Sequence, residues 1–195
     1  MSKIKFHRKL DEILSFVEAG NNNFAKHLNK GVDENYIKEQ LLDINISPNS
    51  EILWLYSWKN GMLVEKGTPL DDIQFFPGYH FLSIDDAILQ YSLIKGDDRW
   101  NSSWLPFMAN GAGDYYMVDL SALETVKAPV LSFFSEESEC DIEYECIDKM
   151  TSTFLEGFRK KIIYYDQYGY LEMDDDKYCL LAGNINPTID FWKYD

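Results

Sequence analysis

The spacing of apolar residues changes from a helical period to a strand period about a third of the way along this chain. Before that point, Leu10, Ile13, Leu14 and Val17 form one helical stripe, and Gly20 is a typical helix end. After it, short segments alternate with a period near two. Strict alternation of strands and helices is absent, which argues against a doubly wound parallel fold.

Two more helices are expected before the change of period. One begins after Asp33, a residue type that caps helices well. The other has Ser47 as its N-cap and Pro48 in its first helical position, and it ends at Asn60-Gly61.

The middle of the chain reads as a series of short strands. Aromatic segments bounded by Pro, Gly, Asp or Asn predict strands at 73–76, 105–109, 115–120 and 130–134. A helix that opens at Ser83 interrupts them. Because proline cannot donate to a ladder, Pro106 predicts that its strand lies at an edge or begins there.

A last helix is expected over residues 151–165, and the tail after Tyr168 is expected to pack back as a strand or hairpin. The order of elements predicts an α+β fold, with a mostly antiparallel sheet and helices packed on one side of it. With 195 residues and 46% apolar residues, the chain is expected to form a single domain over residues 1–195.

The charge balance narrows the class of partner. The chain has 33 acidic and 18 basic residues, for a formal net charge of -15. Such a charge repels nucleic acid and anionic membranes and speeds encounter with a basic protein, although solubility alone also explains it in many proteins. The charged start predicts no signal peptide, and the three cysteines are typical of a reducing compartment. We expect a cytoplasmic protein with no nucleic-acid or membrane partner.

Motifs for catalysis or metal binding do not stand out. The three histidines lie far apart, and Cys140 and Cys146 lack a second pair. Asp174-Asp175-Asp176 lacks the alternating spacing of a calcium loop and reads as a solvated turn. Gly111 to Asp114 lies between two strands and reads as a hairpin turn rather than a phosphate loop. We therefore expect no enzyme activity, no cofactor and no metal.

The most acidic segment runs from residue 136 to 145 and contains no Lys or Arg. If its second half is extended, Asp141, Glu143 and Glu145 share one face. Since unpaired charges are not buried, that face is either solvated or docked on a basic partner. A catalytic carboxylate pair is a weaker alternative, because no histidine accompanies it. The candidate partner-binding residues are Glu136, Glu137, Glu139, Asp141, Glu143 and Glu145.

Three separated segments carry a family resemblance. The first segment contains Ile46-Ser47-Pro48 followed by Leu55-Tyr56-Ser57-Trp58-Lys59-Asn60-Gly61. The second is an aromatic hairpin over residues 104–120, around Gly111 to Asp114. The third begins at Pro129-Val130 and continues through the acidic segment to residues 151–158. Together they resemble the SUKH superfamily, which includes the yeast Smi/Knr cell-wall assembly regulators and many bacterial immunity proteins. The hairpin is the most specific part, although Ala112 stands where the family usually has a second glycine. The resemblance covers about 46–165.

We expect the motif residues to build the fold rather than to carry out chemistry. Their expected tasks are to cap a helix, form a turn, fill the core and bind backbone at a strand end. They are Asn60, Gly61, Trp104, Pro106, Gly111, Gly113, Asp114 and Asp119.

The resemblance implies an α+β binding scaffold whose core spans about residues 33–166, with an added N-terminal helix and a C-terminal extension. It also implies a non-catalytic immunity protein that binds and neutralises a cognate toxin with a basic face, such as a nuclease. The alternative is an intracellular regulatory scaffold that binds an endogenous protein. An enzyme would instead show a pocket with converging polar groups and a strongly shifted pKa.

Overall fold

The computed structural model describes residues 1–121 and 128–193. Its helices are α1 (Lys3–Gly20), α2 (Phe24–His27), α3 (Glu34–Leu42), α4 (Ser50–Trp58), α5 (Ile84–Ile94), α6 (Ile147–Arg159) and α7 (Asp175–Ile185), with 3-10 turns η1 (Leu70–Asp72) and η2 (Asp190–Trp192). Its strands are β1 (Leu28–Lys30), β2 (Lys59–Met62), β3 (Gln74–Phe76), β4 (Tyr79–Phe81), β5 (Trp104–Ala109), β6 (Tyr115–Asp119), β7 (Val130–Phe133), β8 (Asp141–Tyr144), β9 (Ile163–Tyr165) and β10 (Leu171–Met173).

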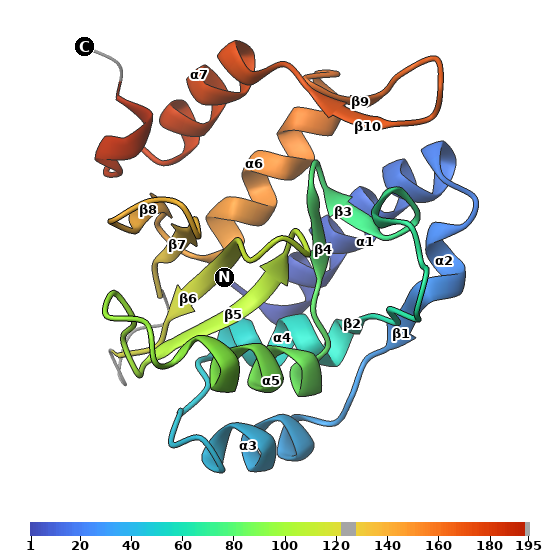
Figure 1. The fold of residues 1–195 in the computed structure, drawn as a ribbon. Helices are drawn as coiled ribbons and strands as arrows, with labels where there is room; N and C mark the ends of the chain where they lie inside the picture. Colours follow the sequence, from blue (N-terminus) through green and yellow to red (C-terminus); the bar gives the residue numbers. More distant parts are fainter. Residues whose placement is uncertain (122–127, 194–195) are drawn as a thin grey trace.

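A six-stranded sheet in the order β3-β4-β5-β6-β7-β8 forms the centre of the molecule (Figure 1). Every neighbouring pair in it is antiparallel. Two separate two-stranded ladders, β1 with β2 and β9 with β10, are also antiparallel. The predicted α+β class with an antiparallel sheet is confirmed.

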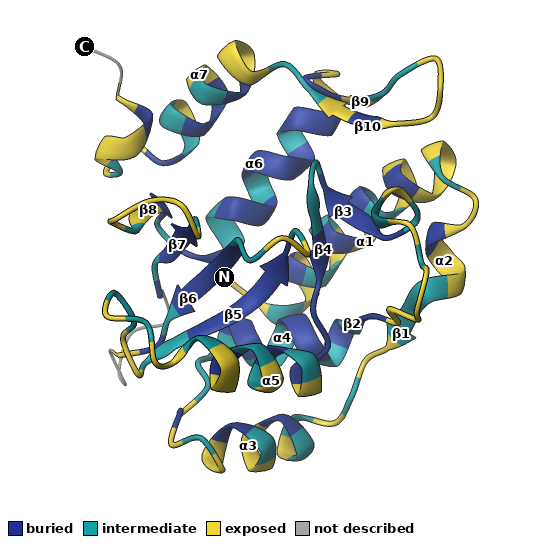
Figure 2. Cartoon of the chain, viewed as in Figure 1, coloured by how far each residue is buried: buried dark blue, intermediate teal, exposed yellow. Residues whose placement is uncertain are grey.

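Side chains on both faces of the sheet are covered, not those of one face alone as expected. The central strands are buried almost throughout (Figure 2). Tyr115 and Tyr116 are consecutive in β6 and therefore point to opposite faces. The Tyr115 hydroxyl donates to Gln90 of α5 at 2.8 Å, while Tyr116 packs against Tyr144, which in turn packs against Phe154 of α6.

The first helix forms as its apolar stripe predicts. Phe6, Leu10, Ile13 and Val17 of α1 are buried, and α1 packs along α6 through the stacked rings of Phe16 and Phe158. The Asp33 carboxylate accepts from the backbone N–H of Asn35 and caps α3 as predicted.

The third helix begins and ends at other residues than expected. Its N-cap is Asn49, whose amide oxygen accepts from the Ile52 N–H at 2.9 Å, so Ser47 and Pro48 lie before the helix. Asparagine caps helices as well as serine does, and Asn49 is closer in the chain than Ser47 to the apolar residues that α4 buries. The helix ends at Trp58, and Asn60-Gly61 belongs to strand β2.

Pro106 lies in an interior strand, which corrects the expectation of an edge. Strand β4 pairs with Met108 and Ala109 of β5 and ends at Phe81, before it reaches Pro106. On the other side Pro106 pairs with Met117 of β6, where the register shifts. The proline is tolerated because the neighbouring strand is too short to need its missing N–H.

The last predicted helix is displaced. Helix α6 spans residues 147–159, and Lys161 in a left-handed conformation (φ 57°) reverses the chain. The Ile162 N–H then donates to the Gly157 carbonyl at 2.8 Å. Residues 163–165, which were predicted to end the last helix, instead form β9, and the tail after Tyr168 contributes the strand β10 that pairs with it. The tail then forms α7, which was not expected, and Asp174 is the N-cap of that helix rather than part of a solvated turn.

Candidate functional site

The family-motif turn is a structural device that holds the start of the acidic segment. Gly111 (φ 78°) and Gly113 (φ 105°) take left-handed conformations between β5 and β6. The Asn110 side-chain oxygen accepts from the backbone N–H groups of Ala112 and Asp114 at 2.7 and 3.1 Å. Asp114 in turn accepts from the backbone N–H and hydroxyl of Ser135, at 2.8 and 3.0 Å. The loop uses its donors internally, as a hairpin turn does.

Asn60 and Gly61 join β2 to the start of α5. The Asn60 side-chain oxygen accepts from the Ile84 N–H at 2.9 Å. Gly61 has φ 67°, and a Cβ placed there would lie 2.1 Å from the Ser83 nitrogen and 2.2 Å from the Leu82 carbonyl carbon. Only glycine permits both the conformation and this close approach.

Trp104 lies at the start of β5 and Asp119 at the end of β6. The Asp119 carboxylate accepts from the Ser121 N–H at 2.8 Å and from the Ser103 hydroxyl at 2.9 Å. Trp104 packs edge-on against Trp100 with ring centroids 6.1 Å apart. These contacts hold the ends of β5 and β6 within the fold.

Arg99 braces the acidic loop between β7 and β8. Its guanidinium lies 4.1 Å from the centroid of the Phe133 ring and pairs with Asp97 at 2.8 Å. It also donates to the Phe134 carbonyl at 2.8 Å and to the Glu137 carbonyl. This anchoring of the backbone leaves the side chains of Glu136, Glu137 and Glu139 exposed.

Glu143 is buried, which corrects the prediction that it shares an exposed face with Asp141 and Glu145. Only 2% of it is exposed, while the neighbouring Ile142 is 47% exposed. In the ladder, Val130 pairs with Tyr144 and Leu131 pairs with Ile142, so Glu143 is an extra residue in β8. Such a bulge breaks the strict alternation on which the prediction rested.

Burial of the Glu143 carboxyl favours its neutral form, while the hydrogen bond that it accepts from a tyrosine hydroxyl partly opposes this effect. Tyr116 donates to it at 3.0 Å, and the indole N–H of Trp192 donates to its backbone carbonyl. Burial raises the pKa of Glu143 to about 7. A carboxyl with this pKa changes its charge near neutral pH.

An exposed surface with apolar and acidic side chains lies beside β8. Asp141 and Ile142 of β8 lie next to Asp190 and Phe191 of η2, around a hollow of about 350 Å³. Phe191 is 43% exposed. Nearby, the Thr188 hydroxyl donates to the Glu145 carboxylate at 2.7 Å, so Glu145 is half-buried and bound within the fold.

Sequence reasoning missed Ile142, Asp190 and Phe191 as surface residues of this site. Residue 190 reaches β8 only through the turn after α7, and no local pattern predicts that contact. We call the exposed side chains of Glu136, Glu137, Glu139, Asp141, Ile142, Asp190 and Phe191 the β8 surface.

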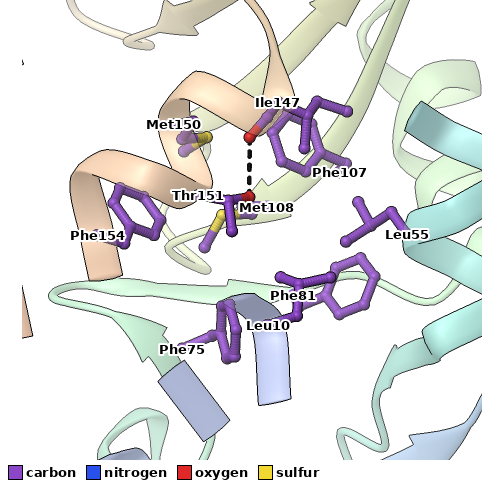
Figure 3. A pocket seen from close by; sticks show the side chains of 10 residues that line it. All are labelled: Leu10, Leu55, Phe75, Phe81, Phe107, Met108, Ile147, Met150, Thr151 and Phe154. Atoms are coloured by element: carbon purple, nitrogen blue, oxygen red, sulfur yellow. Dashed lines mark hydrogen bonds between the residues drawn. The ribbon is translucent and has the colours of Figure 1, made fainter. Parts of the chain in front are cut away.

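Besides the hollow beside β8, the protein has a small internal cavity and an open cleft. One, of about 20 Å³, is enclosed by apolar side chains from α1, α4, α6 and the sheet, including Leu10, Leu55, Phe107 and Phe154 (Figure 3). It has room for about one water molecule and is a packing void. The other is a cleft of about 460 Å³ between β10, α7 and η2 and the sheet, lined by Phe76, Tyr116, Glu143, Tyr178 and Trp192 among others.

The described residues, 1–121 and 128–193, lack two features that would point to other functions. Within these ranges, no group of three His, Cys, Asp or Glu side chains is placed to hold a metal ion. Cys140, Cys146 and Cys179 form no disulfide with one another. No helix in the same ranges has the length and apolar character that crossing a bilayer requires.

Comparison with known proteins agrees with the motif. The model of the SMI1 / KNR4 family (SUKH-1) matches residues 31–160, which is more than half of the chain. That range holds the six-stranded sheet, the braced acidic loop and the whole of α6, and it leaves out α1, α2, β1 and the elements after α6. A search of curated proteins finds no match. On the extent of the family match, this chain belongs to the SMI1 / KNR4 family (SUKH-1).

Proposed function

We propose that this chain is a non-catalytic protein-binding domain that neutralises a cognate toxin in the bacterial cytoplasm. Membership of the SUKH-1 family is compatible with a protein-binding or immunity role. The observation that carries the proposal is the β8 surface, where two exposed apolar side chains stand among exposed carboxylates. The partner then has a basic face, such as the substrate cleft of a nuclease.

The mechanism divides between steering and anchoring. The formal net charge of -15 attracts a basic face over a range set by ionic strength. Ile142 and Phe191 then supply apolar area at the centre of contact, where buried side chains contribute most of the binding energy. Glu136, Glu137, Glu139 and Asp141 form the charged rim, and occlusion of the toxin follows from contact alone.

The first test is co-expression with the product of the neighbouring gene. Rescue of growth, together with a complex on size exclusion, supports the immunity function. A neighbour that is harmless and forms no complex contradicts it and favours the regulatory scaffold.

A pair of matched variants tests the placement of the surface. The quadruple variant E136Q/E137Q/E139Q/D141N removes four charges from the β8 surface. The control E18Q/E39Q/D43N/E65Q removes four exposed charges from α1, from α3 and its C-cap, and from the segment after β2, which lie away from β8 (Figure 1).

Both variants have the same net charge, so a difference between them reports position. We expect the association rate to fall about tenfold or more for the first variant and less for the control, with the gap closing at high salt. Equal rates for both variants would reject the β8 surface as the docking face while leaving an immunity function intact.

A further inference from the structure

The aromatic cleft beside the β8 surface carries a second recognition feature. Rings of Phe76, Tyr178 and Trp192 form a continuous wall, with centroids 5.6 Å apart between the first two and 5.9 Å between the last two. Glu143 and Tyr116 line the same cleft. A buried carboxyl beside aromatic rings is chemistry that recognises an organic cation.

From this geometry, we propose that the cleft receives an arginine side chain of the partner protein, between the aromatic wall and the Glu143 carboxyl. The inference rests on the proposed function for the source of the arginine, since a partner with a basic face presents such side chains. A guanidinium fits better than an ammonium because it is planar, weakly hydrated and stacks on aromatic rings.

The charges at the cleft favour an incoming cation. Besides Glu143, the charged residues that line it are Asp175 and Lys193. Lys193 is already paired with Asp190, at 2.6 Å. The carboxyls of Glu143 and Asp175 therefore leave the cleft with an excess of negative charge when Glu143 is ionised.

The cleft also adjoins the surface that we propose as the docking face. Phe191 lines both the cleft and the hollow beside β8. An arginine that enters the cleft would therefore extend the same interface, and its burial would place a charged anchor beside Ile142 and Phe191.

Binding of a cation should depend on pH. Burial raises the pKa of Glu143 to about 7, so the carboxyl is mostly neutral at pH 6 and mostly ionised at pH 8. Affinity should rise about tenfold over that interval. Several titratable and charged groups face or surround Glu143. They are Tyr79 of β4, Tyr116 of β6, Tyr178 of α7, Tyr144, Asp141 and Glu137 on its own segment, and Asp175, Cys179 and Lys193 at the cleft.

The test uses the full chain and the peptide acetyl-Gly-Arg-Gly-amide, with the citrulline peptide as its neutral isostere. The NMR signal of the Trp192 indole N–H, identified with W192F, reports the cleft because this group donates to the Glu143 carbonyl. We expect saturable shifts with the arginine peptide below about 50 mM, and binding at least about tenfold tighter than that of the citrulline peptide at pH 8.

Two variants make the test specific. E143Q keeps an acceptor for Tyr116 and should abolish both the arginine preference and the pH dependence. E18Q, an amide change at an exposed carboxylate of α1 outside the β8 surface, should alter neither. Equal binding of the two peptides, an arginine preference that survives in E143Q, or no shift at Trp192 below about 50 mM would each overturn the inference.

These outcomes are independent of the immunity test. Arginine binding without rescue from a toxin would remove the proposed function and leave the cleft as a cation site. Rescue from the toxin without arginine binding would support the proposed function and reject the cleft as a cation site.

Discussion

Replacing Glu143 by glutamine should remove part of the pH dependence of this protein's stability. The carboxyl is 2% exposed, and burial raises its pKa from an ordinary 4.5 to about 7. A raised pKa means that the folded chain holds the proton more tightly than the unfolded chain. The stabilisation is therefore fully present below pH 4.5 and is lost as the pH rises through 7.

The magnitude follows from the size of the rise in pKa. The full effect, reached well above pH 7, corresponds to about 3 kcal/mol, at 1.36 kcal/mol for each pKa unit. Between pH 6 and pH 8, Glu143 alone should lower the free energy of unfolding by about 1.3 kcal/mol. The glutamine side chain of E143Q does not titrate. Between pH 6 and pH 8, the free energy of unfolding of E143Q should therefore fall by about 1.3 kcal/mol less than that of the wild type.

Two other buried groups also have shifted pKa values and contribute to the pH dependence of stability. The contribution of Glu143 is therefore obtained as the difference between the wild type and E143Q. Burial also raises the pKa of Glu51 to about 7, which gives the same sign as Glu143. Burial lowers the pKa of His80, which gives the opposite sign. Both groups remain in E143Q, and their contributions cancel when its pH dependence is subtracted from that of the wild type.

The assay is urea unfolding at pH 6 and pH 8, followed by tryptophan fluorescence. The control E136Q changes an exposed carboxylate to its amide and should keep the wild-type pH dependence. If E143Q and the wild type lose equal stability between the two pH values, the carboxyl does not ionise in a buried site and the reasoning is refuted.

Further substitutions test the packing and the caps. G61A should lower the free energy of unfolding by at least about 2 kcal/mol, since it adds a backbone clash to a left-handed φ. G169A has φ 87° but open space around the added Cβ, and it should cost about 1 kcal/mol. Equal losses of stability in thermal unfolding would contradict the clash at Gly61. F154A removes a ring stacked at 4.0 Å on Phe76 and should cost about 3–5 kcal/mol in urea unfolding. The half-exposed F16A should cost clearly less, and a similar loss would argue against tight packing at Phe154. R99Q should speed cleavage of the acidic loop by a Glu-specific protease, while R8Q should not; unchanged cleavage would show that Arg99 does not brace the loop.

The sequence by itself determined the elements whose signals are local. The stripe of α1, the caps at Asp33 and Ser83, and the strands around Gly111 and Gly113 all form as predicted, because side-chain periodicity and capping act over a few residues. The family motif could be read for the same reason. Its residues bind backbone close to themselves or to the next strand.

Tertiary structure decided which acidic residues reach the surface. The alternation from Asp141 to Glu145 predicted one exposed face, but pairing with β7 introduces a bulge that places Glu143 inside and Ile142 outside. Closure by η2 then adds Phe191 and Asp190 to the surface and Trp192 to the cleft. Register and closure depend on contacts between residues far apart in the chain, and a local pattern of charge and hydrophobicity does not encode them. The acidic composition was plain from the sequence, whereas the division of its carboxyls between a solvated rim and one buried, titrating site came only from the fold.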